Sequence, residues 1–295
     1  MRTEERNERS RDLHKKETSE LLRIINEEDK GVAEAVEETL PDVERVVEEF
    51  VKALRAGGRV FYVGAGTSGR LGVLDAAELH PTFSMPKDRV IGVIAGGERA
   101  LVSSQESRED RPEDGARVVE DYGMSEEDFV IGISASGRTP FVEGCLKRAR
   151  AEGAGTAVVM NNPQGPMESH ADIAVKAITG PEVLAGSTRM KAGTAQKMIL
   201  NMISTAAMVR LGKVYDNLMV DLVASNSKLK ERARRILSEL TEGSREEIEV
   251  ALERTDYSVK HALLMVKGDL SREHARRLLE EVDGHLERAL DGLED

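Results

Sequence analysis

The spacing of apolar residues divides the chain into a helical beginning, an alternating middle and a helical end. Apolar positions recur every three or four residues from Glu17 to Asp29, and again from about Asp29 to Ala56, which predicts a short helix and then a longer one. The pattern then changes to short continuous apolar runs, each closed by glycine or polar residues, which is typical of buried strands. These runs lie at 59–63, 90–94, 129–133, 156–160 and, more weakly, 172–176.

Buried strands that alternate with helices indicate an α/β fold with a doubly wound, mainly parallel, flavodoxin-like sheet of five strands. After the sheet we expect a long apolar helix from Arg189 to Leu211, a helix from Asp221 to about Leu240, and three or four short helices over 244–292. We therefore divide the chain into three parts. They are an arm with helices that pack on the core (1–56), a central ligand-binding domain with long helices (57–240), and a small all-helical C-terminal subdomain (241–295).

Composition narrows the class of protein. The chain has 295 residues and a formal net charge of -12, which argues against a nucleic-acid partner because phosphate backbones require a basic surface. We expect no membrane span, since no segment approaches 18 uninterrupted apolar residues. We expect no signal peptide, since the N-terminus is charged and has no apolar run, and we interpret residues 1–17 as a flexible or partner-bound arm. Cys145 is the only cysteine, which fits a reducing, cytoplasmic compartment, and we interpret it as a buried core residue rather than a nucleophile.

Two polar loops follow predicted strands, at the edge of a parallel sheet where ligands bind. Gly64-Ala-Gly-Thr-Ser-Gly-Arg70 matches the glycine pattern of dinucleotide sites, but Arg70 and Leu71 replace the lysine and hydroxyl residue of a nucleotide triphosphatase. The second loop, Ser134-Ala-Ser-Gly-Arg-Thr139, places three hydroxyls within six residues. A single helix cap needs one hydroxyl, so this spacing favours a phosphate site over capping alone.

A third segment, 180–197, opens the long apolar helix with glycines, hydroxyls and cations. The free backbone N–H groups of a helix N-terminus are a ready site for an anion, and we expect Ser187 and Thr188 to contact it. Arg189, Lys191 and Lys197 are weaker candidates, and Arg189 could instead pair with Glu182.

These residues resemble the SIS (sugar isomerase) domain, a phosphosugar-binding fold. Its Gly-Thr-Ser turn corresponds here to Gly66, Thr67 and Ser68, and its Ser-x-Ser-Gly-x-Thr pattern to Ser134, Ser136, Gly137 and Thr139. The segment 180–197 is similar to the signature of the N-acetylmuramic acid 6-phosphate etherase family, which is related to animal glucokinase regulatory protein. The segments 74–83, 94–101 and 210–221 are also similar to the etherases.

The resemblance implies a carbon–oxygen lyase that cleaves the lactyl ether of a 6-phosphosugar, with no metal or redox cofactor. Glu78 and Glu109 match the two glutamates that serve this chemistry. We expect Glu78 to protonate the departing lactate and Glu109 to act as the second acid or base, with the roles open to exchange. From spacing alone Glu106 competes with Glu109, and Asp75 either orients a loop or lies on a helix surface.

The resemblance also implies a homodimer that binds a phosphosugar. We expect neither a nucleic acid nor a membrane as a partner. Three other functions stay open at this point. A non-catalytic sugar-phosphate sensor would bind without turnover, an aldose–ketose isomerase would not need the lactyl group, and a dinucleotide-binding protein would use the glycines from Gly64 to Gly69.

Overall fold

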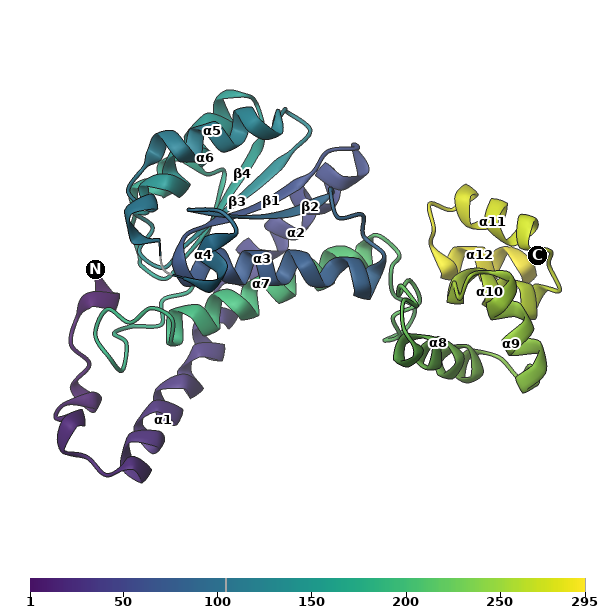
Figure 1. Cartoon of the computed structure of the whole chain (residues 1–295), viewed down its shortest axis with the longest axis horizontal. Coiled ribbons are helices and arrows are strands. Elements are labelled where there is room, and N and C mark those ends of the chain that lie inside the picture. The colour runs from purple at the N-terminus through teal and green to yellow at the C-terminus, as the bar shows by residue number, and fades with distance from the viewer. Residues whose placement is uncertain (104, 295) are drawn as a thin grey trace. The chain divides into compact units, whose positions relative to one another are not determined.

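The computed structural model describes residues 1–103 and 105–294, and it divides into two compact units (Figure 1). The larger unit comprises residues 1–76 and 88–204, and the smaller unit comprises residues 77–87 and 205–295. Each unit has its own buried apolar core. The division of the chain at residues 56/57 and 240/241, made from the sequence, stays a prediction.

The larger unit is built on a five-stranded, fully parallel sheet. Its order is β2-β1-β3-β4-β5. The chain begins at β1, next to one edge, continues to the edge strand β2, and then adds β3, β4 and β5 in turn toward the other edge. This is the flavodoxin-like doubly wound order, and the predicted fold class is confirmed. The strands are β1 (Val60–Gly64), β2 (Val90–Ile94), β3 (Phe129–Ser134), β4 (Gly155–Met160) and β5 (Ile173–Lys176).

Helices cover both faces of the sheet (Figure 1). Phe61 and Val63 of β1 pack in one apolar cluster with residues of α5 (Pro112–Tyr122) and α6 (Pro140–Ala151). Tyr62 points to the opposite face, where its ring lies 6.4 Å from that of Phe50. That face is covered by α2 (Leu40–Arg55) and by the first parts of α3 (Gly66–Phe83) and α7 (Lys191–Arg210). Alternating side chains of one strand thus serve two separate helix layers.

The predicted boundary between the first two helices is wrong. Helix α1 runs without a break across Asp29, from Thr18 to Glu37, and α2 begins at Leu40. The break falls at Thr39, whose hydroxyl donates to the Val36 carbonyl at 2.7 Å, two residues ahead of a proline that suits the first turn of a helix. A half-buried aspartate within the helix does not stop it, whereas the Thr-Leu-Pro sequence does.

The N-terminal arm is ordered, which differs from the flexible arm expected from its charge. It forms three short 3-10 turns, and Thr3 is fully buried although its neighbours are exposed. These turns and the remaining short elements of the larger unit are η1 (Arg2–Glu4), η2 (Glu8–Ser10), η3 (Leu13–Lys15), α4 (Arg99–Val102), η4 (Glu106–Arg108) and η5 (Pro166–His170).

The smaller unit is helical and packs around a second apolar core that includes Leu237, Leu252 and Leu263. Asp221 accepts from Lys213 at 2.8 Å and from the buried Lys260 at 2.9 Å, which fixes the segment that enters this core. Its complete helices are α8 (Ser227–Leu240), α9 (Arg245–Arg254), α10 (Val259–Gly268), α11 (Arg272–Glu281) and α12 (Leu286–Glu294).

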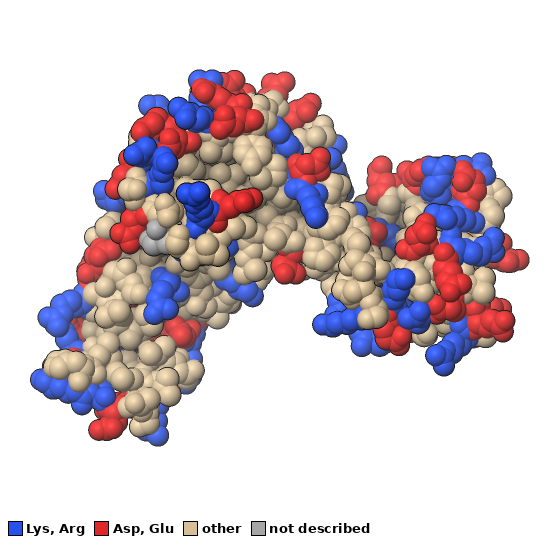
Figure 2. Space-filling model, viewed as in Figure 1, with Lys and Arg blue, Asp and Glu red and all other residues tan. Residues whose placement is uncertain are grey.

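Charged side chains of both signs are interspersed over the face drawn in Figure 2, in line with the high charge content of 33%. Among the described residues, no helix is both long enough and apolar enough to cross a lipid bilayer.

Candidate functional site

The glycine loop after β1 and the predicted acid Glu109 meet at one point. Gly66 has a φ of +52°, in the left-handed region that favours glycine, and an added Cβ would lie 3.1 Å from Oε1 of Glu109. The Glu109 backbone carbonyl accepts the Phe141 N–H at 3.0 Å, in the first turn of α6. Glu109 is therefore held between the glycine loop and the helix that follows the second polar loop.

The surroundings of Glu109 favour its protonated form. Burial is the largest cause that raises the pKa of this carboxyl, and the charges of Asp110 and Glu106 raise it further. Arg70 opposes them, and its Nε donates to the Leu101 carbonyl at 3.2 Å. A half-buried carboxyl with a raised pKa can exchange a proton nearer to neutral pH than an ordinary glutamate. Glu106, the competing candidate, is exposed.

The second polar loop gathers its three hydroxyls into one cluster. Ser134 Oγ lies 2.7 Å from Thr139 Oγ1 and 3.3 Å from Ser136 Oγ, and it accepts the Gly137 N–H at 3.1 Å. The Thr139 side chain makes no capping hydrogen bond to α6, so the hydroxyls are not explained as a helix cap. Gly137 has a φ of +67°, and an added Cβ would lie 2.8 Å from Met160 Sδ. The loop is thus shaped by glycine and lined by hydroxyl groups.

Ser68 and Thr67, the other two predicted ligand residues of the glycine loop, have different surroundings. The hydroxyl of Ser68 is buried and donates to Gln196 Oε1 at 2.8 Å, and Gln196 in turn donates to Asn161 Oδ1 at 2.9 Å. Ser68 therefore links the start of α3 to α7 and to the end of β4. Thr67 is half-buried, and its methyl group lies 3.4 Å from an added Cβ on Gly193 of α7.

The start of α7 already holds an anion of the protein itself. Glu182 is fully buried, and its two carboxylate oxygens accept the backbone N–H groups of Lys191 and Ala192, both at 2.9 Å. The expectation of free N–H groups at this helix N-terminus is therefore wrong, because an internal carboxylate occupies them. The partner of Glu182 is the helix backbone rather than Arg189.

The candidate ligand residues of segment 180–197 differ in their exposure to solvent. Ser187 and Thr188 are half-buried in the turn before α7, and Arg189 and Lys197 are exposed. Lys191 is buried, and its ammonium is paired with Glu28 of α1 at 2.6 Å. Lys191 is therefore not retained as a candidate ligand, because Glu28 already neutralises its charge inside the larger unit.

Glu78 lies on α3 and belongs to the smaller unit of the chain, whereas Glu109 belongs to the larger one. Glu78 is exposed and lies more than three helical turns after Gly66.

Asp75, about one turn before Glu78 on the same helix, is buried, so the interpretation that it lies on the helix surface is wrong. Its Oδ1 accepts from Asn201 at 2.8 Å and from Ser204 at 3.1 Å, which ties α3 to α7. His80 bonds the Met85 carbonyl at 2.9 Å and is structural.

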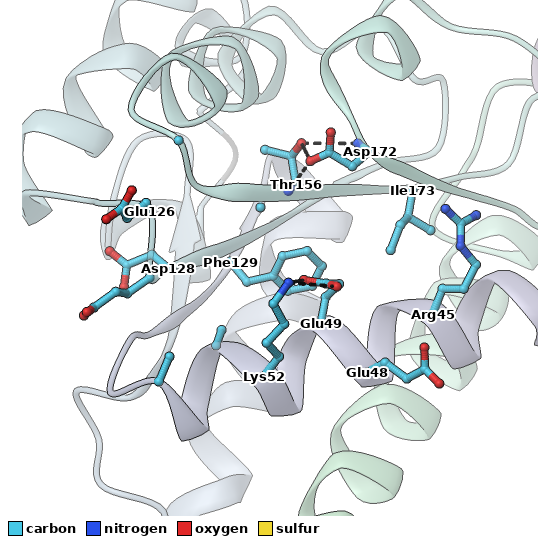
Figure 3. Close-up of a pocket in the computed structure, with 15 residues that line it drawn as sticks. Arg45, Glu48, Glu49, Lys52, Glu126, Asp128, Phe129, Thr156, Asp172 and Ile173 are labelled. Carbon is cyan, nitrogen blue, oxygen red and sulfur yellow. Dashed lines mark hydrogen bonds and ion pairs between the residues drawn. The ribbon is translucent and has the colours of Figure 1, made fainter.

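A cavity of about 460 Å³ lies at the other end of the sheet (Figure 3). Phe129 and Ile173, the first residues of β3 and β5, form part of its wall, so it opens at the amino ends of the strands. Two of its charged residues pair with each other, Lys52 and Glu49, at 2.8 Å. Ligands of parallel sheets bind at the carboxyl ends, so this cavity is separate from the polar loops.

Cys145 is buried away from the polar loops. Burial raises the pKa of its thiol to about 12, which confirms that it is a core residue.

The fold and the loops define a SIS-domain α/β protein. The SIS domain family matches residues 120–206, the N-terminal SIS domain of glucokinase regulatory protein matches residues 42–150, and the C-terminal lid domain of that regulator matches residues 216–281. A phosphoheptose isomerase structure from Neisseria gonorrhoeae shares the fold with a TM-score of 0.51 at 16% identity, over 64% of this chain and 98% of that chain.

Full-length relatives narrow the class to one family. The chain is 53% identical to N-acetylmuramic acid 6-phosphate etherase 1 of Bacillus licheniformis, over 98% of this chain and 95% of the relative. It is 49% identical to the N-acetylmuramic acid 6-phosphate etherase of Caldanaerobacter subterraneus, over 98% of this chain and 94% of the relative. The chain belongs to the N-acetylmuramic acid 6-phosphate etherase family.

Proposed function

We propose that the protein cleaves the lactyl ether of N-acetylmuramic acid 6-phosphate, releasing D-lactate and N-acetylglucosamine 6-phosphate. Full-length identity of about half to named etherases supports the substrate. The observation that carries the chemistry is the carboxyl of Glu109 against Gly66, with its backbone bonded to the helix that follows the hydroxyl loop. This contact supports a proton-transfer role for Glu109 beside the proposed phosphate ligands.

An ether resists direct hydrolysis because an alkoxide is a poor leaving group. In the open-chain sugar, the C1 aldehyde acidifies the proton on C2, and a base removes it. The electron pair then forms a C2–C3 double bond while the C3–O bond breaks, and an acid protonates the lactate oxygen as it leaves. Water adds back at C3 and a proton returns to C2, so one water is consumed overall. Two carboxyl groups suffice for these proton transfers.

In this proposal Gly66, Thr67 and the hydroxyl cluster of Ser134, Ser136 and Thr139 hold the phosphate, aided by the backbone of Gly137. Ser187 and Thr188 contact the sugar from the turn before α7, and the exposed cations Arg189 and Lys197 can reach the anionic groups of the substrate. Ser68 orients the glycine loop through Gln196. Glu109 exchanges the proton at C2, and Glu78 protonates the departing lactate.

We further propose a homodimer in which Glu78 of one chain completes the site of the other. Glu78 is exposed, and it follows Leu74, whose side chain is 51% exposed on the same helix. Met202 of α7 is also 37% exposed. Large apolar groups on neighbouring helices favour burial against a second copy, and a twofold axis would exchange the two Glu78 residues between sites. We place this enzyme in the cytoplasm, in the recycling of cell-wall sugars.

Lactate release tests the proposed reaction directly. Purified protein incubated with N-acetylmuramic acid 6-phosphate should release D-lactate, and Glu78→Ala and Glu109→Ala should each abolish release while N-acetylglucosamine 6-phosphate still binds. Binding without any lactate from the wild-type protein would favour a sensor. Interconversion of hexose phosphates without lactate release would favour an isomerase.

Mixed dimers test whether the site is shared. Glu78→Ala chains and Glu109→Ala chains, each inactive alone, are mixed in equal amounts and allowed to exchange subunits. If each site takes one glutamate from each chain, half of the dimers hold one intact site, and the mixture regains about a quarter of the wild-type activity. If both glutamates of a site come from the same chain, every site in the mixture carries a substitution and activity stays absent.

A further inference from the structure

The N-terminal arm joins two of the polar loops at the carboxyl end of the sheet. The Arg2 backbone N–H donates to Asn162 Oδ1 at 2.8 Å, and Asn162 Nδ2 donates to Thr3 Oγ1 at 3.2 Å. The Thr3 carbonyl accepts the Gly186 N–H at 3.0 Å. Thr3 therefore bonds through its side chain to the loop after β4 and through its backbone to the turn that carries Ser187 and Thr188.

Asn162 extends this link to the hydroxyl loop. Its Nδ2 also donates to the Ala135 carbonyl at 2.9 Å, and Ala135 lies between Ser134 and Ser136. The Asn161 N–H donates to the same carbonyl at 3.0 Å. Both asparagines are buried, as is Thr3, so these hydrogen bonds are shielded from competing water. The hydroxyl loop, the loop after β4 and the turn before α7 are thus connected through one arm residue.

Further contacts fasten the arm along the same segment. The Ser10 hydroxyl donates to the Val183 carbonyl at 2.7 Å, and Asn7 donates to the Pro181 carbonyl at 3.2 Å and to Glu28 at 2.7 Å. The Glu4 carboxylate lies against Gly186, where an added Cβ would approach its Oε2 to 2.9 Å. The arm therefore contacts the segment from Pro181 to Gly186 at several points between Thr3 and Ser10.

We propose that the arm is part of the phosphosugar site and that Thr3 is a positioning residue, which holds the Ser187–Thr188 turn in register with the hydroxyl loop. This proposal rests on the proposed function. A turn already held in its binding conformation needs little further ordering when the sugar binds, whereas a released turn loses conformational entropy at that moment and binds more weakly. Loss of the arm should therefore raise KM more than it lowers kcat.

The test uses the full chain and four variants. Deletion of residues 2–6 removes the link, Thr3→Val removes the hydroxyl but keeps the shape, and Thr3→Ser restores the hydroxyl. Thr18→Val is the matched control, because Thr18 is exposed at the start of α1. We expect the deletion to raise KM for N-acetylmuramic acid 6-phosphate about tenfold, the ratio that corresponds to about 1.4 kcal/mol. Thr3→Val should give a smaller rise, and Thr3→Ser and Thr18→Val should match the wild type.

Hydrogen exchange of the Gly186 peptide supplies a readout that does not depend on turnover, since the Gly186 N–H bonds to Thr3. The deletion should accelerate its exchange, and circular dichroism should show that the variant is folded. A folded deletion variant with the wild-type KM would overturn the inference, whatever its kcat. Failure of the proposed function looks different, because the wild-type protein would then release no lactate at all.

Discussion

Substitution of Glu182 tests the conclusion that α7 begins on an internal carboxylate. Both oxygens of this buried side chain accept backbone N–H groups, from Lys191 and from Ala192. Glu182→Ala removes both acceptors and leaves a space too enclosed for free access of water. Glu182→Gln keeps one carbonyl oxygen and places an amide NH₂ where the second oxygen was, so one of the two N–H groups loses its acceptor.

The expected magnitudes follow from those two groups. A buried donor left without an acceptor costs about 1–3 kcal/mol, so Glu182→Ala should destabilise the larger unit by about 2–6 kcal/mol, and Glu182→Gln by about half of that. Burial is the largest cause that raises the pKa of Glu182, which means that the buried charge itself opposes folding. The neutral glutamine removes this penalty, so the destabilisation caused by Glu182→Gln should lie at the lower end of its range. Against a total stability of about 5–15 kcal/mol, the alanine variant should be severely weakened.

Urea denaturation followed by far-ultraviolet circular dichroism measures the effect. Because two units can unfold in separate transitions, hydrogen exchange of peptides from α7 assigns the loss to the larger unit. Glu44→Ala and Glu44→Gln are the controls, since Glu44 is exposed on α2. Equal midpoints for the Glu182→Ala and Glu44→Ala variants would refute the capping role, as would a glutamine variant that is less stable than the alanine variant.

Two other carboxyl groups allow predictions from their pKa directions. Burial raises the pKa of Asp75 above its ordinary value of 3.8, so its favourable contribution is complete below that value and is lost as pH rises through the folded-state pKa. Asp75→Asn should therefore gain stability relative to wild type as pH rises above 3.8 in urea titrations, and a difference that does not change with pH would contradict this. The charge of Glu106 raises the pKa of Glu109, and the charge of Arg70 lowers it. Glu106→Gln should therefore move the acid limb of the kcat/KM profile to lower pH, and Arg70→Gln should move it to higher pH. Shifts of both variants in the same direction would exclude Glu109 as the group that titrates.

Much of the fold could be predicted because the sheet is parallel and buried. Strands covered on both faces are continuous apolar runs, and each of the five runs is a strand within one or two residues of its predicted position. Glycine and hydroxyl residues directly after a strand also lie at the carboxyl edge by necessity of the topology. The sequence therefore agrees with a position of Glu109 near the glycine loop. It does not predict the contact between Glu109 and Gly66.

What could not be predicted are pairings between residues far apart in the chain. Thr3 and Gly186 are brought together only by the folded arm, and the charge of the first 17 residues indicates flexibility instead. Glu182 and the start of α7 are nine residues apart, yet the glycines and hydroxyls between them suggest a ligand rather than an internal cap. Periodicity also failed at Asp29, because this half-buried aspartate does not interrupt α1, which continues to Glu37.

The same residue type thus serves three purposes, and the surroundings decide which. Glu182 is buried and caps a helix, Glu109 is half-buried with a raised pKa beside Gly66, and Glu78 is exposed on α3. Because Glu182 occupies the N-terminus of α7, a substrate phosphate at that point would meet a carboxylate rather than free N–H groups. The start of α6 carries no side-chain cap, and Ser134 Oγ lies within hydrogen-bond distance of the Ser136 and Thr139 hydroxyls. Ser134 and Ser136 also accept backbone N–H groups, so their own O–H groups can turn toward a phosphate. The phosphate should therefore bind at the Ser134–Thr139 loop, within reach of the glycine loop that Glu109 faces.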